Sequence, residues 1–183
     1  WQDVQRALKP GEAAIEFVSF NQGYKGDTTV YAALLITPES KQPQSIRLFE
    51  DYELKKIIGS VAENNYRLIN KIYGSNQNYN TELYKLIWQP LEQYLTGIKT
   101  VYYAPVGVLN KISFPALAKN NSILLCDVYN LQQLSSTGKL INPVIFSLGK
   151  NLSASIFGGI DYNPDTPKVE LWKELPGTLL ESE

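Results

Sequence analysis

The sequence predicts an α/β fold in which a mixed sheet is flanked by helices, and three observations support this expectation. β-branched and aromatic residues are concentrated at 13–20, 29–37 and 45–49, which is typical of strands. Two segments with helical apolar spacing follow between residues 54 and 95. A nearly continuous apolar run at 98–104 then predicts a strand that helices bury on both faces.

Composition excludes several classes of function. The 183 residues are 44% hydrophobic and 19% charged with a net charge of -1, and lysines and arginines are scattered. We therefore expect a soluble protein that does not bind nucleic acid. No apolar run approaches the roughly 18 residues of a membrane-spanning helix, so we expect no membrane contact. The single cysteine, Cys126, excludes an internal disulfide and fits a cytoplasmic location.

The N-terminal residues predict a short helix. Trp1, Val4 and Leu8 follow helical spacing, and Lys9-Pro10-Gly11 ends the pattern. The first residues lack the basic and apolar blocks of a signal peptide, and without an initiator methionine we expect the sequence to be a piece of a longer chain. We interpret residues 1–9 as the tail of an upstream helical region.

The first two strand segments are expected to form an antiparallel pair. Asp51 is expected to cap one helix over 54–72, and the polar residues 74–80 separate it from a second helix over 83–95. Pro90 lies inside the second pattern and should kink or split it, because proline removes a backbone donor.

The later part of the chain predicts further strands at 123–129 and 155–160, and a short helix at 136–141. At the other end of the sequence, Thr178 and Glu181 have the spacing of a capping box, but too few residues follow to form the helix. We therefore expect the fold to be incomplete at its C-terminus.

The chain lacks the usual residues of nucleophilic catalysis. Serine and cysteine nucleophiles normally need a base with a pKa near neutrality, and the sequence has no histidine. A histidine-dependent triad or dyad is therefore excluded within these residues. Cys126 lies between large apolar residues, and we interpret it as an inert core cysteine on a strand; the alternative, a thiolate nucleophile, has no visible partner.

Two Gly-Lys pairs were tested as phosphate-binding loops. Such a loop needs a glycine five positions earlier and a hydroxyl residue directly after the lysine. Gly138-Lys139 is followed by Leu140 and Gly149-Lys150 by Asn151, and neither pair has the upstream glycine. Both pairs are interpreted as ordinary turns.

No metal or cofactor site is expected. The following carboxylates lack the alternating spacing of a calcium loop: Asp161, Asp165, Glu170 and Glu174. Gly158 and Gly159 close a predicted strand just before Asp161, where an open α/β sheet can hold a ligand. A structural turn is the favoured interpretation. A flavodoxin-like domain that binds a small anion or a nucleotide at these three residues is the alternative.

Several motifs, taken in order along nearly the whole chain, strongly resemble those of the CHAT domain, a caspase- and separase-like family usually fused to tetratricopeptide repeats. They are Trp1-x-x-Val4, Gly11-Glu12-Ala13-Ala14-Ile15-Glu16-Phe17, Tyr31-Ala32-Ala33-Leu34, Leu83-Tyr84, Trp88-x-Pro90-Leu91, Pro105-Val106-Gly107-Val108-Leu109, Phe114-Pro115-Ala116-Leu117, Leu134-Ser135-Ser136, Phe157-Gly158-Gly159 and Leu175-Pro176-Gly177-Thr178.

The resemblance implies a caspase-like three-layer sandwich whose N-terminal, non-catalytic half spans residues 10–183. In this family the histidine and cysteine of the catalytic dyad follow the Leu-Pro-Gly-Thr segment, so no catalytic, cofactor-binding or metal-binding residue is assigned here. Residues 100–120 resemble the central strand and a Pro-x-Gly-x-Leu hairpin, with Val106 in place of an acidic residue and Ser113 in place of a frequent proline. We expect the following residues to be core: Tyr102, Tyr103, Phe114 and Leu117.

The resemblance also carries the functional expectation. We expect the scaffold half of a cysteine endopeptidase, inactive alone, that associates with the downstream catalytic half of the same chain. A protein partner is expected to bind through the upstream helical repeats. The alternative is a CHAT protein without its dyad, which acts as a protein-interaction module.

Overall fold

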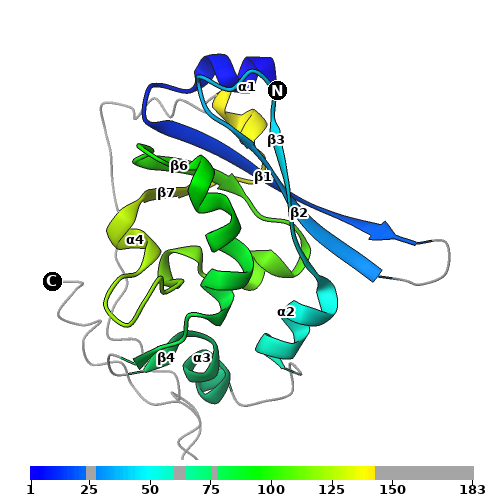
Figure 1. The fold of residues 1–183 in the computed structure, drawn as a ribbon, viewed down its shortest axis with the longest axis vertical. Helices are drawn as coiled ribbons and strands as arrows, with labels where there is room; N and C mark the ends of the chain where they lie inside the picture. Colours follow the sequence, from blue (N-terminus) through cyan, green and yellow to red (C-terminus); the bar gives the residue numbers. More distant parts are fainter. Residues whose placement is uncertain (24–27, 60–64, 76–77, 143–183) are drawn as a thin grey trace, which may run out of the picture. The chain divides into compact units, whose positions relative to one another are not determined.

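The computed structural model describes residues 1–23, 28–59, 65–75 and 78–142. Within them a five-stranded mixed sheet has the order β3-β2-β1-β6-β7, and helices lie on both of its faces (Figure 1). The prediction of an α/β fold with a mixed sheet is confirmed. Among the described residues, no helix combines the length and apolar character needed to cross a membrane.

The strands of the main sheet are β1 (Glu12–Gln22), β2 (Thr28–Ile36), β3 (Gln44–Glu50), β6 (Thr100–Ala104) and β7 (Asn130–Gln133), and β4 (Gly74–Ser75) pairs separately with β5 (Asn78–Tyr79). The α-helices are α1 (Gln2–Ala7), α2 (Asp51–Ile58), α3 (Asn65–Tyr73) and α4 (Leu125–Val128). Tighter or wider helical turns are the π-helix η1 (Tyr84–Trp88) and the 3-10 helices η2 (Gln89–Tyr94), η3 (Gly107–Lys111), η4 (Phe114–Ala116) and η5 (Thr137–Leu140).

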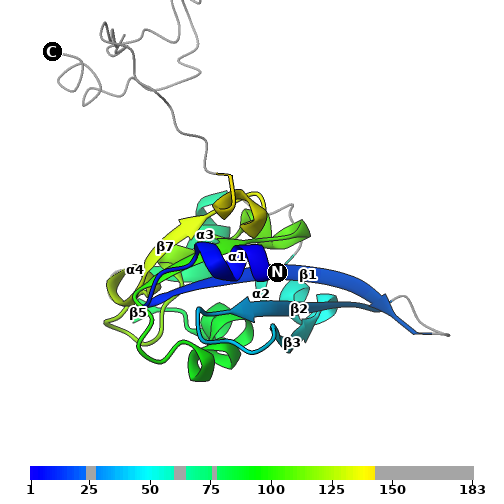
Figure 2. The ribbon, with the colours of Figure 1, turned by 90° about the horizontal axis from the view of Figure 1, so that it is seen from above.

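The first three strands form an antiparallel meander, as expected for the first pair. β1 pairs with β2 from Ala14↔Ile36 to Gln22↔Thr28, and β2 pairs with β3. β6 then enters on the other side of β1, parallel to it, and β7 lies parallel to β6. Because β6 pairs only with residues 12–16 of β1, the β1–β2 hairpin extends well past it (Figure 2).

The helical region differs from the prediction in two respects. Two separate helices, α2 and α3, replace the single helix expected over 54–72. Gly59, with φ +78, follows the last residue of α2 in a conformation that L-residues rarely adopt, which ends that helix. The N-cap is Glu50 rather than Asp51, and the Glu50 N–H donates to Glu53 Oε2 at 2.8 Å.

The second helical segment breaks where the sequence predicts. The π-helix η1 gives way to the 3-10 helix η2 at Gln89, one residue before Pro90. Proline has no N–H to continue the preceding hydrogen-bond pattern, so the change of helix type follows from its chemistry.

Two strand predictions are wrong. The residues after Pro105 form the 3-10 helices η3 and η4 rather than a hairpin, and Gly107 at the start of η3 has φ +55. The strand expected over 123–129 is mainly the short helix α4, because the Leu124 N–H donates to Asp127 Oδ2 at 2.8 Å and starts a helical turn. The strand β7 begins only after α4.

The predicted short helix near 136–141 is confirmed as η5.

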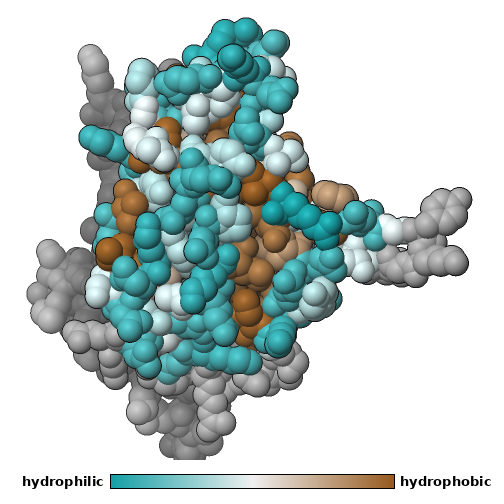
Figure 3. Space-filling view, viewed as in Figure 1, coloured by the Kyte–Doolittle hydropathy of each residue, from teal (hydrophilic) through white to brown (hydrophobic). Residues whose placement is uncertain are grey.

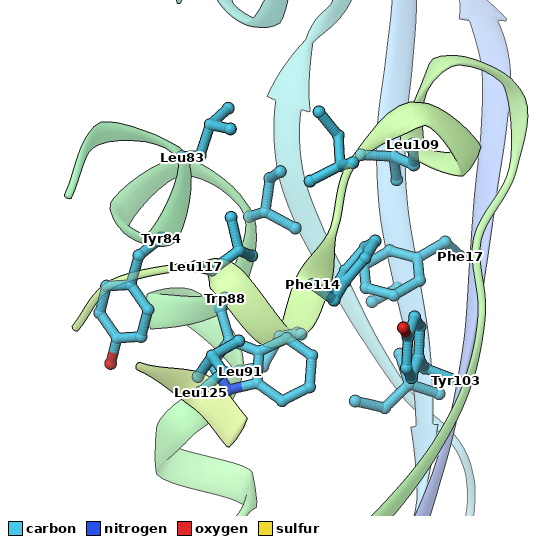
Figure 4. Close-up of a cluster of buried hydrophobic side chains, with 14 of the residues drawn as sticks. Phe17, Leu83, Tyr84, Trp88, Leu91, Tyr103, Leu109, Phe114, Leu117 and Leu125 are labelled. Carbon is cyan, nitrogen blue, oxygen red and sulfur yellow. The ribbon is translucent and has the colours of Figure 1, made fainter. Parts of the chain in front are cut away.

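The main core lies between the sheet and the face that carries α2, α3, α4 and η1 to η4. Phe114 is fully buried at its centre, with ring centroids 4.6 Å from Tyr103, 5.3 Å from Phe17 and 6.2 Å from Trp88 (Figure 4). The outer surface on this side is largely hydrophilic, with an apolar strip alongside α2 (Figure 3). The prediction that Tyr103, Phe114 and Leu117 are core is confirmed.

A smaller apolar cluster covers the other face of the sheet. Val4 and Leu8 of the α1 segment pack against Ala14 and Ile36, with half-buried Tyr102 beside them, so Tyr102 belongs to this second layer rather than to the main core. The predicted N-terminal helix is confirmed as α1. Its role as the tail of an upstream region stays a prediction.

Replacing Phe114 with alanine should lower the free energy of unfolding by about 3–5 kcal/mol, because it removes the ring that three other aromatic side chains contact. Urea unfolding followed by circular dichroism measures the change. The matched control is Tyr52→Ala, whose side chain is 63% exposed and should change stability by no more than about 0.5 kcal/mol. Equal effects of the two substitutions would contradict this description of the core.

Candidate functional site

The carboxyl ends of β6 and β7 meet at one edge of the sheet, beside the middle of β1. In the register, Glu16 of β1 lies beside Ala104 of β6, and Tyr103 of β6 lies beside Gln133 of β7. Ligands and catalytic groups of open α/β sheets gather outside these strand ends. The polar side chains there are therefore the first candidates for a functional site.

Glu16 connects the sheet to the segment that follows β7. Its Oε2 accepts hydrogen bonds from the Thr137 N–H at 2.8 Å and from Thr137 Oγ1 at 2.6 Å. Thr137 is buried at the start of η5, and Ser136 caps that helix by accepting from the Gly138 N–H at 3.3 Å. Glu16 lies on β1 and Thr137 is the first residue of η5. The two hydrogen bonds therefore hold η5 against the sheet.

Tyr103 and Gln133 link β6 to β7 on the core side. The Tyr103 hydroxyl donates to Gln133 Oε1 at 3.2 Å, and burial raises the pKa of Tyr103. A phenol with a raised pKa stays protonated near neutral pH, so it acts here as a hydrogen-bond donor and not as a base.

The outer edge of β7 has no strand partner among the described residues. The Asn130 N–H donates to Lys99 O and the Leu134 N–H to Tyr103 O, both at 2.8 Å. Backbone groups alternate in direction along a strand, so the N–H groups of Leu131 and Gln133 point away from β6. These groups form a short template to which a further strand can pair.

A second polar cluster ties η2 to the segment after η4. The ammonium group of Lys119, after η4, forms an ion pair with Glu92 of η2, and its Nζ lies 2.6 Å from Glu92 Oε1. Burial alone would raise the pKa of Glu92, but Lys119 and the nearby Tyr84 hydroxyl together outweigh burial and lower that pKa below its usual value. The Tyr84 hydroxyl and Trp88 Nε1 are buried nearby without a hydrogen-bond partner in the described part of the chain. Burial, together with the Glu92 carboxylate, raises the pKa of Tyr84.

Cys126 is exposed, so its predicted burial on a strand is wrong. It lies on α4, where Leu125 takes the buried position instead. Pro115, Asp127 and Tyr129 are among the residues around it in a shallow hollow of about 480 Å³. Without a histidine anywhere in the chain, no imidazole can activate this thiol.

The arrangement offers no complete catalytic or metal site. Ser135 and Ser136 follow β7 at the strand ends, but no histidine exists to serve as their base. Among the residues that the structure describes, no group of three His, Cys, Asp or Glu side chains is placed to hold a metal ion. The polar contacts at this edge therefore organise the backbone.

The other sequence candidates fall in two groups. Gly138-Lys139 lies in the 3-10 helix η5, in agreement with its interpretation as a turn. Several candidates lie outside the described residues: Gly149-Lys150, Gly158, Gly159, Asp161, Asp165, Glu170, Glu174, Thr178 and Glu181.

Sequence reasoning did not identify Glu16, although the sequence carries a signal for it. Glu16 is the only charged residue in the run from Ala13 to Val18, and a carboxylate in an apolar strand needs polar partners. Its partner Thr137 is 121 residues away, so only the fold reveals the contact.

Comparison with known proteins finds no match: no family model, no curated protein and no solved structure is significantly similar to this chain.

Replacing Glu16 with alanine should lower the free energy of unfolding by about 1–3 kcal/mol, because it leaves the buried donors of Thr137 without their acceptor. Thr137→Val removes the shorter hydrogen bond alone. In a double-mutant cycle the two effects should couple by at least about 0.5 kcal/mol. Additive effects would contradict the contact, and Glu39→Ala at an exposed turn is the control.

Proposed function

We propose that this chain is the non-catalytic scaffold half of a caspase-like, CHAT-type domain, and that a downstream catalytic half completes the sheet next to β7. The observation that carries the proposal is that the outer edge of β7 has no strand partner among residues 1–23, 28–59, 65–75 and 78–142. Parallel sheets are normally covered on both faces, and an edge strand presents unpaired N–H and C=O groups to which a further strand can pair. A strand added there would extend the parallel order of β1, β6 and β7.

The surface on the α1 face also supports a missing layer. The side chain of Phe20 is 50% exposed and that of Leu34 is 36% exposed. Alternate residues of a strand share a face, so Phe20 lies on the same face of β1 as Ala14 and Glu16. Leu34 pairs with Glu16 and lies on that face as well. The α1 segment packs on this face at Ala14 and Ile36, and Val30 and Ala32 on the same face are buried, so Phe20 and Leu34 are two separate exposed side chains. A further element packed on either of them would remove it from water.

The chemistry of the chain agrees with a scaffold role. The sequence has no histidine, and its only cysteine, Cys126, is exposed on the helix α4 rather than at the carboxyl end of a strand. A cysteine peptidase needs both a thiolate and a base. Both would come from the catalytic half, where the resemblance expects a His-Gly strand and a later Ala-Cys strand.

The second candidate is a CHAT-type protein without a catalytic dyad, in which the domain relays protein contacts. The exposed apolar side chains of Phe20 and Leu34 favour it as points of contact with a partner. The two candidates differ in the downstream half, because only the peptidase requires a histidine and a cysteine there.

The test is peptide cleavage by a protein that contains residues 1–183 together with the downstream half. We expect thiol-dependent cleavage that iodoacetamide abolishes, and none from residues 1–183 alone. The Cys126→Ser variant is the control: it should retain full activity, because Cys126 has no base.

Three results would contradict parts of this proposal. Cleavage by residues 1–183 alone would contradict the scaffold role. Loss of activity in Cys126→Ser would place the nucleophile in this chain. A folded longer protein that has both dyad residues and cleaves no peptide would favour the interaction module.

A further inference from the structure

A groove bordered by α2, α3 and η3 has an apolar floor. Its apolar lining comes from Leu54 and Ile58 of α2, Ile72 of α3, and Val108 and Ile112 at η3. The volume is about 720 Å³. Sites for small molecules typically measure roughly 300–1,000 Å³ and are lined mainly by apolar side chains with a few polar groups.

Positive charge dominates the rim of the groove. Among the described lining residues Asp51 is the only carboxylate, and Lys55 Nζ lies 2.5 Å from Asp51 Oδ2, so these two charges neutralise each other. Lys56 and Lys111 also line the groove, and neither takes part in an ion pair within the described part of the chain. The described part of the rim therefore carries a surplus of two positive charges.

A fourth lysine stands at the Gly59 end of the groove. A Cβ atom placed on Gly59 would lie 3.0 Å from Lys71 Nζ, which shows how close the ammonium group comes to this lining residue. Apolar walls with ammonium groups at the mouth match a molecule that has an apolar body and an anionic end.

The size of the lining separates a small ligand from a protein partner. Ten of the residues that the structure describes line the groove. A stable protein interface uses roughly 20–30 residues on each side. The groove is therefore too small for a docked protein surface, and it suits one alkyl chain with a charged head.

We propose that this groove binds a single-chain anionic amphiphile of the fatty-acid class. The alkyl chain lies between α2 and η3, and the carboxylate lies at Lys56 and Lys111. The proposal does not depend on the scaffold role proposed above. Each methylene that the groove buries should tighten binding about fourfold, so affinity rises with chain length.

The experiment titrates the 183-residue protein, labelled with ¹³C in its methyl groups, with sodium dodecanoate below its micelle concentration. We expect saturable shifts of the methyl signals of the apolar lining: Leu54, Ile58, Ile72, Val108 and Ile112. Octanoate, which has four fewer methylenes, should bind at least about tenfold more weakly.

Variants separate the roles of charge and of the apolar floor. Lys56→Glu combined with Lys111→Glu should weaken dodecanoate binding about tenfold or more, because it reverses the rim charge on two exposed side chains. Lys139→Glu on η5, which contacts α1 on the opposite face of the sheet, should leave the affinity unchanged. Val108→Trp should block binding by filling the groove.

Some outcomes would overturn the proposal. The absence of a saturable shift with dodecanoate, or shifts confined to methyl groups elsewhere, would contradict binding in this groove. Equal affinity for dodecanol or for dodecyltrimethylammonium would contradict the preference for an anion. Unchanged affinity in the double lysine variant would contradict the role of Lys56 and Lys111. Binding of an acidic amphipathic peptide at these methyl groups, without binding of dodecanoate, would also overturn it in favour of a protein partner.

Discussion

The parallel pairing of β6 between β1 and β7 is the constraint on which the rest of the structure depends. A parallel neighbour of β1 needs a connection that crosses a face of the sheet, and the chain between β3 and β6 supplies it as α2, α3, η1 and η2 (Figure 1). The same pairing makes β6 a central strand. Val101 and Tyr103 are therefore buried on the main core side, and Tyr102 packs toward α1.

This topology also determines where unsatisfied surface remains. Placing β6 inside leaves β7 as a four-residue edge strand whose outward N–H groups belong to Leu131 and Gln133. The contact of Glu16 with Thr137 brings the chain back over β1 after that edge. Among the described residues no strand pairs with this edge, and the scaffold proposal rests on that feature of the sheet rather than on side-chain chemistry.

The sequence predicted features that depend on local chemistry. Strong β-branched runs located β1, β2 and β3, and Pro90 located the break between η1 and η2. It failed where contacts distant in sequence, or single hydrogen bonds, decide the outcome. The apolar run over 123–129 predicts a strand, but the hydrogen bond from the Leu124 N–H to Asp127 starts a helical turn. Cys126 is exposed on that turn. The lysine-rimmed groove was not predicted because its walls come from three separate segments.

Amide hydrogen exchange along β7 tests the central claim most directly. In the isolated chain, the amides of Asn130 and Leu134 should be protected by their bonds to β6, while those of Leu131 and Gln133 exchange quickly. In a protein that includes the downstream half, Leu131 and Gln133 should become protected as well, because a strand pairs with the outer edge. Fast exchange of these two amides in a folded longer protein would contradict completion of the sheet at β7.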